Sequence, residues 1–287
     1  MHYLQPTTLI VAMCLWLAPI LPDSPMCRAQ AILDGDFDSL PVGTAPDNDV
    51  PAGAWHFTQG LRFVNELDDP EVFTIVPTDS FSPGSLGNSL RINGAESALH
   101  HVTNRLVDDQ RFSGEYTLRF DTYVVSGGGG SIYIAGNHRG GEEIHDGGAN
   151  HNTDRGPQLV FEPDGRLSAT VGSTAPNGPA TSRTLGEYEF DEWLTYEIRG
   201  NVVGNNGANR FDLYAVLDSG ELSEIASNIP FRSRALAPEY IDRVTLAHFG
   251  LGNTEQYFDN IRFVPEPTSF GLLPLALFCL IARLLRK

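Results

Sequence analysis

The sequence predicts an all-β protein whose body, residues 32–263, is a two-sheet antiparallel β-sandwich. Short runs with an apolar residue at every second position fill this body, and Gly, Pro, Asn and Asp separate the runs. Helical periodicity is nearly absent from the same stretch, and no linker divides it. We therefore expect one large β domain between two apolar ends.

The strands follow from alternation along the chain. In YTLRFDTYVV (116–125), WLTYEIR (193–199) and RFDLYAVL (210–217), apolar residues take one face and charged residues the other. In EPDGRL (162–167), Asp-Gly stands between two apolar runs, which predicts a hairpin. The other expected strands lie at 54–64, 72–76, 89–92, 98–102, 131–135, 157–162, 166–171, 244–249 and 256–263.

Several of these stretches resemble the concanavalin A-like (laminin-G-like) jelly-roll group. The resemblance is carried by FDSLPVGTAP, NSLRING, GPQLVFEPDGRLSA, EWLTYEIRGN and QYFDNIRF, so it extends over most of the body. It implies a jelly roll. The group includes lectins, carbohydrate-binding modules, glycoside hydrolases, polysaccharide lyases and adhesion domains, so the fold does not select an activity.

The N-terminus, residues 1–31, is expected to be a signal peptide. Leu9 to Leu21 forms an apolar helical core, and Ala29-Gln30-Ala31 supplies the small residues of a cleavage site. All three cysteines, Cys14, Cys27 and Cys279, fall in the two end segments. The body therefore contains no disulfide, no cysteine nucleophile and no cysteine ligand for a metal.

The C-terminus, VPEPTSFGLLPLALFCLIARLLRK (264–287), combines a Pro-Glu-Pro motif, a short apolar helix and a basic tail. It resembles the PEP-CTERM sorting signal of Gram-negative envelope proteins, with its motif and tail at Pro265, Glu266, Pro267, Arg283, Arg286 and Lys287. The resemblance implies cleavage by an exosortase-like enzyme after a transient inner-membrane stop, and localisation to the cell envelope or extracellular matrix. The basic end fits the positive-inside rule. A permanent anchor is the alternative.

Charge limits the partners of the body. It carries 34 Asp and Glu against 15 Arg, and the only lysine of the chain is Lys287. Such a field repels nucleic acid and anionic membranes, which leaves membrane contact to the C-terminal helix alone. Cations and neutral partners are favoured.

Four aspartates form a candidate structural calcium site. Asp34, Asp36 and Asp38 alternate along an extended segment, and Asp259 shares the parity of the core residues Ile261 and Phe263. In jelly rolls similar to this one the first and last strands are neighbours, which would bring both segments together. Oxygen ligands suit Ca²⁺. The alternative is a solvated turn, with Asp259 accepting backbone N–H groups.

The segment 135–156 is rich in glycine and contains His138, His145 and His151 among several carboxylates. Long loops are often functional or mobile, so a solvated loop and a ligand-contacting loop both remain open. The histidine spacings match no compact metal motif. A metal or acid–base site is the third interpretation.

Catalytic motifs are missing from the body. The acidic stretch GEYEFDEW (186–193) lacks the Glu-x-Asp-x-x-Glu pattern of retaining glucanases of this fold, and His100, His101 and Arg105 lack the context of alginate lyases. We therefore assign no catalytic residue. Tyr123 and Tyr214 lie opposite the apolar faces of their strands, which makes them candidates for stacking on sugars.

Together these observations predict an exported, envelope-sorted, non-enzymatic β-sandwich that can bind extracellular glycans. A polysaccharide hydrolase or lyase is one alternative. A purely structural or adhesive surface protein is the other.

Overall fold

The structure, a computed structural model, describes residues 32, 35–43, 55–59, 73–82, 86–93, 99–106, 111–136, 155–172, 180–203, 209–232, 240–249 and 255–265. These residues belong to one compact unit bounded by Ala31 and Glu266. They form fourteen β-strands and one short 3-10 helix, η2 (Thr78–Ser80). The all-β prediction is therefore confirmed for this part of the chain.

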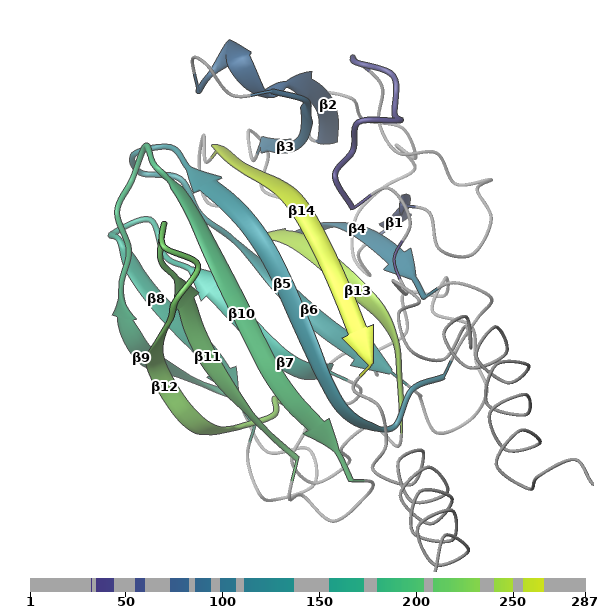
Figure 1. The fold of residues 1–287 in the computed structure, drawn as a ribbon, viewed down its shortest axis with the longest axis vertical. Helices are drawn as coiled ribbons and strands as arrows, with labels where there is room; N and C mark the ends of the chain where they lie inside the picture. The colour runs from purple at the N-terminus through teal and green to yellow at the C-terminus, as the bar shows by residue number, and fades with distance from the viewer. Residues whose placement is uncertain are drawn as a thin grey trace, which may run out of the picture. The chain divides into compact units, whose positions relative to one another are not determined.

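The strands form two antiparallel sheets of seven strands each. Sheet I runs in the order β1 (Trp55–Gln59), β4 (Leu99–Arg105), β13 (Ile241–Phe249), β6 (Gly130–Gly136), β7 (Arg155–Phe161), β8 (Arg166–Val171), β9 (Thr181–Glu187). Sheet II runs in the order β12 (Leu222–Pro230), β11 (Arg210–Val216), β10 (Trp193–Val202), β5 (Gly114–Val124), β14 (Glu255–Pro265), β3 (Asn88–Asn93), β2 (Phe73–Pro77). Figure 1 shows β10, β5 and β14 of sheet II in front of strands of sheet I.

The core lies between the sheets, and it follows from the period-2 patterns. On β5 the even-numbered residues from Tyr116 to Val124 are buried, while the odd-numbered ones are exposed or half-buried. Leu118 and Phe120 on sheet II and Ile132 and Ile134 on sheet I belong to one apolar cluster. Burying a large apolar side chain fully contributes about 1.5–3 kcal/mol, so this two-sided core is the main source of stability.

The sequence did not predict two of the strands, β9 and β12. Both lie at the same end of the sandwich, where each is the last strand of its sheet. Four successive residues of β9, from Thr181 to Thr184, are exposed, and β12 has only Ile229 fully buried. A last strand pairs on one side and packs little, so its sequence alternates weakly and gives a poor signal.

The expected Asp-Gly hairpin is present between β7 and β8. The Glu162 N–H donates to the Arg166 carbonyl at 2.9 Å, and the Gly165 N–H donates to the Glu162 carbonyl at 3.0 Å. Gly165 has a φ of 84°, in the left-handed region that glycine adopts without strain. The turn residues therefore specify this hairpin directly.

One expectation about β14 is wrong. Asp259 does not share the core-facing side with Ile261 and Phe263, because a β-bulge separates them. The pairing of β14 with β5 shifts between Asp259 and Arg262, and Asn260 has a φ of 51°. The bulge inserts an extra residue and reverses the alternation. Tyr257 and Asp259 consequently lie on the outer face of sheet II, opposite Tyr123 and Asp121.

Candidate functional site

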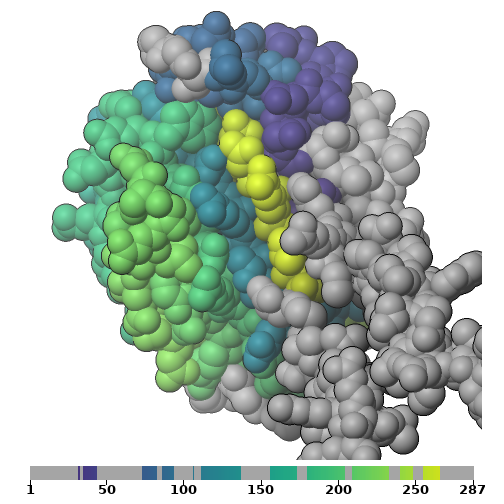
Figure 2. Space-filling model, in the orientation of Figure 1, coloured from purple at the N-terminus to yellow at the C-terminus, as the bar shows by residue number. Residues whose placement is uncertain are grey.

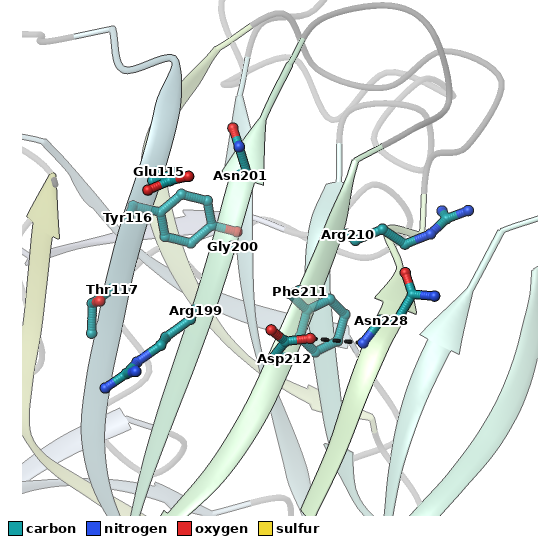
Figure 3. A pocket seen from close by; sticks show the side chains of 10 residues that line it. All are labelled: Glu115, Tyr116, Thr117, Arg199, Gly200, Asn201, Arg210, Phe211, Asp212 and Asn228. Atoms are coloured by element: carbon teal, nitrogen blue, oxygen red, sulfur yellow. Dashed lines mark hydrogen bonds between the residues drawn. The ribbon is translucent and has the colours of Figure 1, made fainter. Parts of the chain in front are cut away.

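A groove of about 750 Å³ crosses the outer face of sheet II (Figure 3). Its polar lining comes from four strands that are neighbours in the sheet: Glu115 and Thr117 from β5, Arg199 and Asn201 from β10, Arg210 and Asp212 from β11, and Asn228 from β12. We call this hollow the sheet II groove. It is lined by carboxylates, guanidinium groups, amides and a hydroxyl, which are the groups that hydrogen-bond to sugar hydroxyls.

The groove also reaches Tyr116, Gly200 and Phe211. Tyr116 pairs across the strands with Gly200, and a Cβ atom on Gly200 would lie 2.2 Å from the Tyr116 hydroxyl. The absence of a side chain at Gly200 is therefore what makes room for the tyrosine ring. Tyr116 packs against Phe263, with ring centroids 5.3 Å apart.

Two buried polar atoms lie near the groove, Asn201 Oδ1 on the outer side of the sheet and the Tyr116 hydroxyl on its core side. Among the described residues neither atom has a hydrogen-bond partner. Burial also raises the pKa of Tyr116 well above its ordinary value, so the hydroxyl stays protonated and can donate. An unpaired buried polar group costs about 1–3 kcal/mol, so a water molecule or a ligand hydroxyl in the groove would be held favourably by Asn201 Oδ1.

Tyr214 lies next to the groove but does not present a free ring. The Arg199 guanidinium carbon lies 5.1 Å from the centre of the Tyr214 ring, and Arg199 Nη2 forms an ion pair with Glu197 Oε1 at 2.7 Å. One face of the tyrosine is therefore covered by a cation. Tyr214 does lie on the outer face of the sheet, as expected, and its other ring face is the one that a sugar could stack on.

Tyr123 belongs to a cluster of four aromatic rings on the same outer face. Its ring lies edge-on to Phe81, Trp193 and Tyr257, at 5.2, 5.7 and 6.0 Å between centroids. Phe81 stacks on Tyr257 at 3.6 Å. Trp193 and Tyr123 remain half-buried, so the cluster combines packing with a partly exposed aromatic surface.

An acidic cluster surrounds the bulge of β14. Asp259 pairs with Asp121 across the strands, and Asp36 and Asp38 lie close enough to act on its charge. Burial above all, with the charges of Asp121, Asp38 and Asp36, raises the pKa of Asp259 to about 7 despite the opposing effect of the Asn260 N–H. The N-terminal residues are held here because the Ile261 N–H donates to the Gly35 carbonyl at 2.7 Å. Figure 2 shows these residues, in purple, beside β14, in yellow.

Three of the four expected calcium ligands, Asp36, Asp38 and Asp259, thus lie in one region, and Asp34 lies outside the described residues. Asp121 is a member that the sequence did not suggest, because only the β5–β14 pairing places it there. In the part of the chain that the structure describes, no three His, Cys, Asp or Glu side chains form a group that could hold a metal ion. Asp38 instead accepts the Asn88 N–H at 2.7 Å.

Other sequence candidates lie elsewhere. His138, His145 and His151 fall outside the described residues, as do the side chains of His100, His101 and Arg105. The acidic stretch before β10 is a turn in which Asp191 accepts the Ser126 N–H at 3.3 Å. Glu189, Asp191 and Glu192 are exposed there. This agrees with a charged turn preceding a strand.

The outer face of sheet I carries a second set of polar residues, which the sequence did not reveal. Ser131 and Gln158 are fully buried, and Ser131 Oγ and Gln158 Nε2 have no hydrogen-bond partner. Arg232 Nη1 donates to Gln158 Oε1 at 2.5 Å. Tyr133 and Thr245 form a cross-strand pair and are also buried. Single polar residues in apolar strands give no sequence signal that separates such a face from ordinary surface.

The expected signal peptide, 1–31, lies outside the described residues, as do the sorting motif and its tail from Glu266 to Lys287. Pro265 is the last residue of β14. No helix within the described ranges has the length and apolar character needed to cross a membrane.

The sequence matches no protein-family model and no curated protein. Among solved structures, the chain is similar to the catalytic domain of a glycoside hydrolase family 131 protein from Coprinopsis cinerea, with 12% identity, a TM-score of 0.48, and coverage of 84% of this chain and 96% of the other. It is also similar to the globular domain of T. cruzi calreticulin, with 11% identity, a TM-score of 0.46, and coverage of 74% and 84%. The third is a glycosyl hydrolase family protein from Mycobacterium fortuitum, with 13% identity, a TM-score of 0.45, and coverage of 79% of this chain and 96% of the other. Likenesses at this level do not indicate a ligand or a reaction for this chain.

Proposed function

We propose that this protein is an exported, non-enzymatic β-sandwich that binds extracellular polysaccharide in the sheet II groove. The observation that carries the proposal is the groove itself: about 750 Å³ of open space on the sheet, lined by seven polar side chains from four adjacent strands. A surface of this kind offers many hydrogen-bonding groups side by side, which suits a chain of sugars.

An unpartnered atom of the groove supports the same proposal. Asn201 Oδ1 can accept a hydrogen bond, and it has no partner among the described residues. A sugar hydroxyl can satisfy this atom, because it donates one hydrogen bond. Binding would thereby recover part of the free energy that burial of this atom costs.

The strand positions of the two groove carboxylates differ from the close pair of a retaining glycosidase. Glu115 and Asp212 lie on β5 and β11, which are separated by β10. Strands are roughly 4.8 Å apart, so the two backbones are about 10 Å apart across the sheet alone. Retaining glycosidases need their carboxyl groups about 5–5.5 Å apart. This pair does not match that arrangement.

Export, sorting and calcium remain parts of the proposal that rest on the sequence. The apolar N-terminus and the Pro265-Glu266-Pro267 motif with its basic tail support transport to the envelope or extracellular matrix and processing by an exosortase-like enzyme. The acidic cluster around Asp259 supports a structural Ca²⁺, which would offset the repulsion between its carboxylates. Fractionation of cells, with the C-terminus probed before and after export, tests the sorting route.

Binding is tested with the purified full-length protein against a panel of polysaccharides, by affinity electrophoresis and calorimetry. We expect at least one polysaccharide to bind, and Asn201→Ala to weaken that binding about tenfold, which corresponds to a lost hydrogen bond of about 1.4 kcal/mol. Ser219→Ala, in the exposed turn after β11, is the matched control and should leave affinity unchanged. If no polysaccharide on a broad panel binds, the proposal is wrong. With a polysaccharide that binds, the affinities of Tyr123→Ala and Tyr214→Ala show whether the nearby aromatic rings contribute to binding.

A further inference from the structure

Two arginines face each other on the outer side of sheet II. Arg119 on β5 pairs directly with Arg262 on β14, and both are exposed. The neighbouring pair Leu118 and Phe263 is buried in the core, which places both arginines on the opposite face. Side chains at facing positions have Cβ atoms roughly 4.5–5.5 Å apart, and like charges there are destabilising. The arrangement therefore costs the free protein some stability.

The carboxylates around this pair are committed to other partners. Asp121 Oδ1 accepts from Thr195 Oγ1 at 2.7 Å, and its Oδ2 accepts from Asn260 Nδ2 at 2.9 Å. Glu197, which faces Arg119 from β10, is paired with Arg199 instead. Within the described ranges neither Arg119 nor Arg262 forms an ion pair.

This arrangement is unexpected for the composition of the chain. The chain has 36 acidic residues against 19 basic ones, so carboxylates are available for arginines to pair with. Arg91, Arg166, Arg199 and Arg243 each do so. Two adjacent unpaired guanidinium groups therefore form a local site for an anion. Each planar guanidinium group can donate two parallel hydrogen bonds to the oxygens of a carboxylate or sulfate.

The arginine pair borders the sheet II groove. Thr117, which lines the groove, is the next outward-facing residue of β5 after Arg119. Thr117 also pairs with Arg199 of the groove on one side and with Val264 of β14 on the other. A polysaccharide lying in the groove would therefore have Arg119 and Arg262 at its edge.

We propose that the sheet II groove binds an anionic polysaccharide, with the carboxylate or sulfate groups of the sugars held by Arg119 and Arg262. This inference rests on the proposed glycan binding and adds the chemical class of the glycan. It departs from what net charge favours, because a net charge of −17 disfavours polyanions. At physiological salt the Debye length is about 8 Å, so the charges in direct contact with the ligand outweigh distant ones.

The test compares charged and uncharged polymers of the same sugar. Polygalacturonate is compared with its fully methyl-esterified form, and dextran sulfate with dextran, each titrated into the full-length protein. We expect the charged polymer of at least one pair to bind at least about tenfold more tightly than its neutral counterpart. The pair that shows the preference tells whether the recognised group is a carboxylate or a sulfate.

Variants locate the effect. Arg119→Gln with Arg262→Gln should weaken binding of the charged polymer about tenfold to a hundredfold and leave the melting temperature unchanged or higher, because the like-charge pair is removed. Arg183 is an exposed arginine on β9 of sheet I, so Arg183→Gln removes one arginine charge from the other sheet and should have no effect on affinity.

Equal affinity for charged and neutral polymers, or an Arg119→Gln, Arg262→Gln variant that binds like wild type, overturns this inference and leaves the proposed glycan binding standing. If none of the four polymers binds, and the wider polysaccharide panel also gives no binding, both proposals fail together.

Discussion

Asp121 on β5 and Asp259 on β14 face each other on the outer side of sheet II, and Asn260 joins them. Asn260 donates from Nδ2 to Asp121 Oδ2 at 2.9 Å and from its backbone N–H to Asp259 Oδ1 at 2.6 Å. Asp259 is only 8% exposed, and Asp36 and Asp38 lie nearby. Two facing carboxylates that are largely shielded from water repel each other, and a bound proton or cation would relieve that repulsion. We therefore expect the stability of this region to respond to pH and to calcium.

The first prediction concerns pH. Burial and the neighbouring Asp121, Asp38 and Asp36 raise the pKa of Asp259 to about 7 in the folded protein, above its ordinary 3.8. The folded state therefore binds this proton more tightly than the unfolded state. The stabilisation from the proton is complete below about pH 3.8 and is lost as pH rises through about 7. We expect the melting temperature in EDTA to fall between pH 5 and 8 more steeply in wild type than in Asp259→Asn.

Asp218→Asn, in the exposed turn after β11, is the control and should keep the wild-type slope. Equal slopes for wild type and Asp259→Asn would show that this carboxyl does not titrate as the structure implies.

The second prediction concerns calcium. A cation between the carboxylates of the acidic cluster would replace the proton, and binding to the native state alone must raise stability. At pH 7.5 we expect millimolar Ca²⁺ to raise the melting temperature by several degrees and EDTA to reverse the change. Asp259→Asn should abolish the response. A wild-type melting temperature that is the same in Ca²⁺ and in EDTA contradicts a structural ion.

The third prediction concerns the core side of sheet II behind the groove. Tyr116→Phe removes a buried hydroxyl that has no partner, so the free energy of unfolding should stay the same or rise. Gly200→Ala places a Cβ atom 2.2 Å from that hydroxyl and 2.4 Å from the ring carbon that bears it, so it should cost about 1–3 kcal/mol. Urea denaturation measures both. A destabilised Tyr116→Phe would mean that the hydroxyl has a stabilising partner.

The fourth prediction concerns the N-terminal segment. A Cβ atom on Gly35 would lie 1.9 Å from the Ile261 carbonyl oxygen, which is backbone and cannot turn aside. Gly35→Ala should therefore release the segment from β14, lower stability by about 1–3 kcal/mol, and speed proteolysis near residue 35. Gly186→Ala is the matched control, since its Cβ would meet only Ile225 Cγ2 at 3.6 Å. Equal protease sensitivity of the two variants would contradict this role for the contact.

The strands with strong alternation could be predicted, and the acidic site only in part. β5, β10 and β11 alternate clearly because one face of each packs in the core, and that pattern is local to a few residues. The expected adjacency of the first and last segments does bring Asp36 and Asp38 close to Asp259, but the face of the sheet on which Asp259 lies was predicted wrongly. The parity of Asp259 was read across Asn260, where the bulge reverses it. A bulge depends on the partner strand, so a single strand does not reveal it.

The sequence by itself determined the class of fold, the Asp-Gly hairpin and the acidic character of the body, because these depend on residue type and short-range order. Only the tertiary structure decided which side chains share a surface. The groove brings together Thr117, Asn201 and Asp212 from three strands. Arg119 is the cross-strand partner of Arg262, which lies 143 residues later in the sequence. Strand order and register are set by packing over the whole core, and a shift of one residue would turn each of these side chains to the other face.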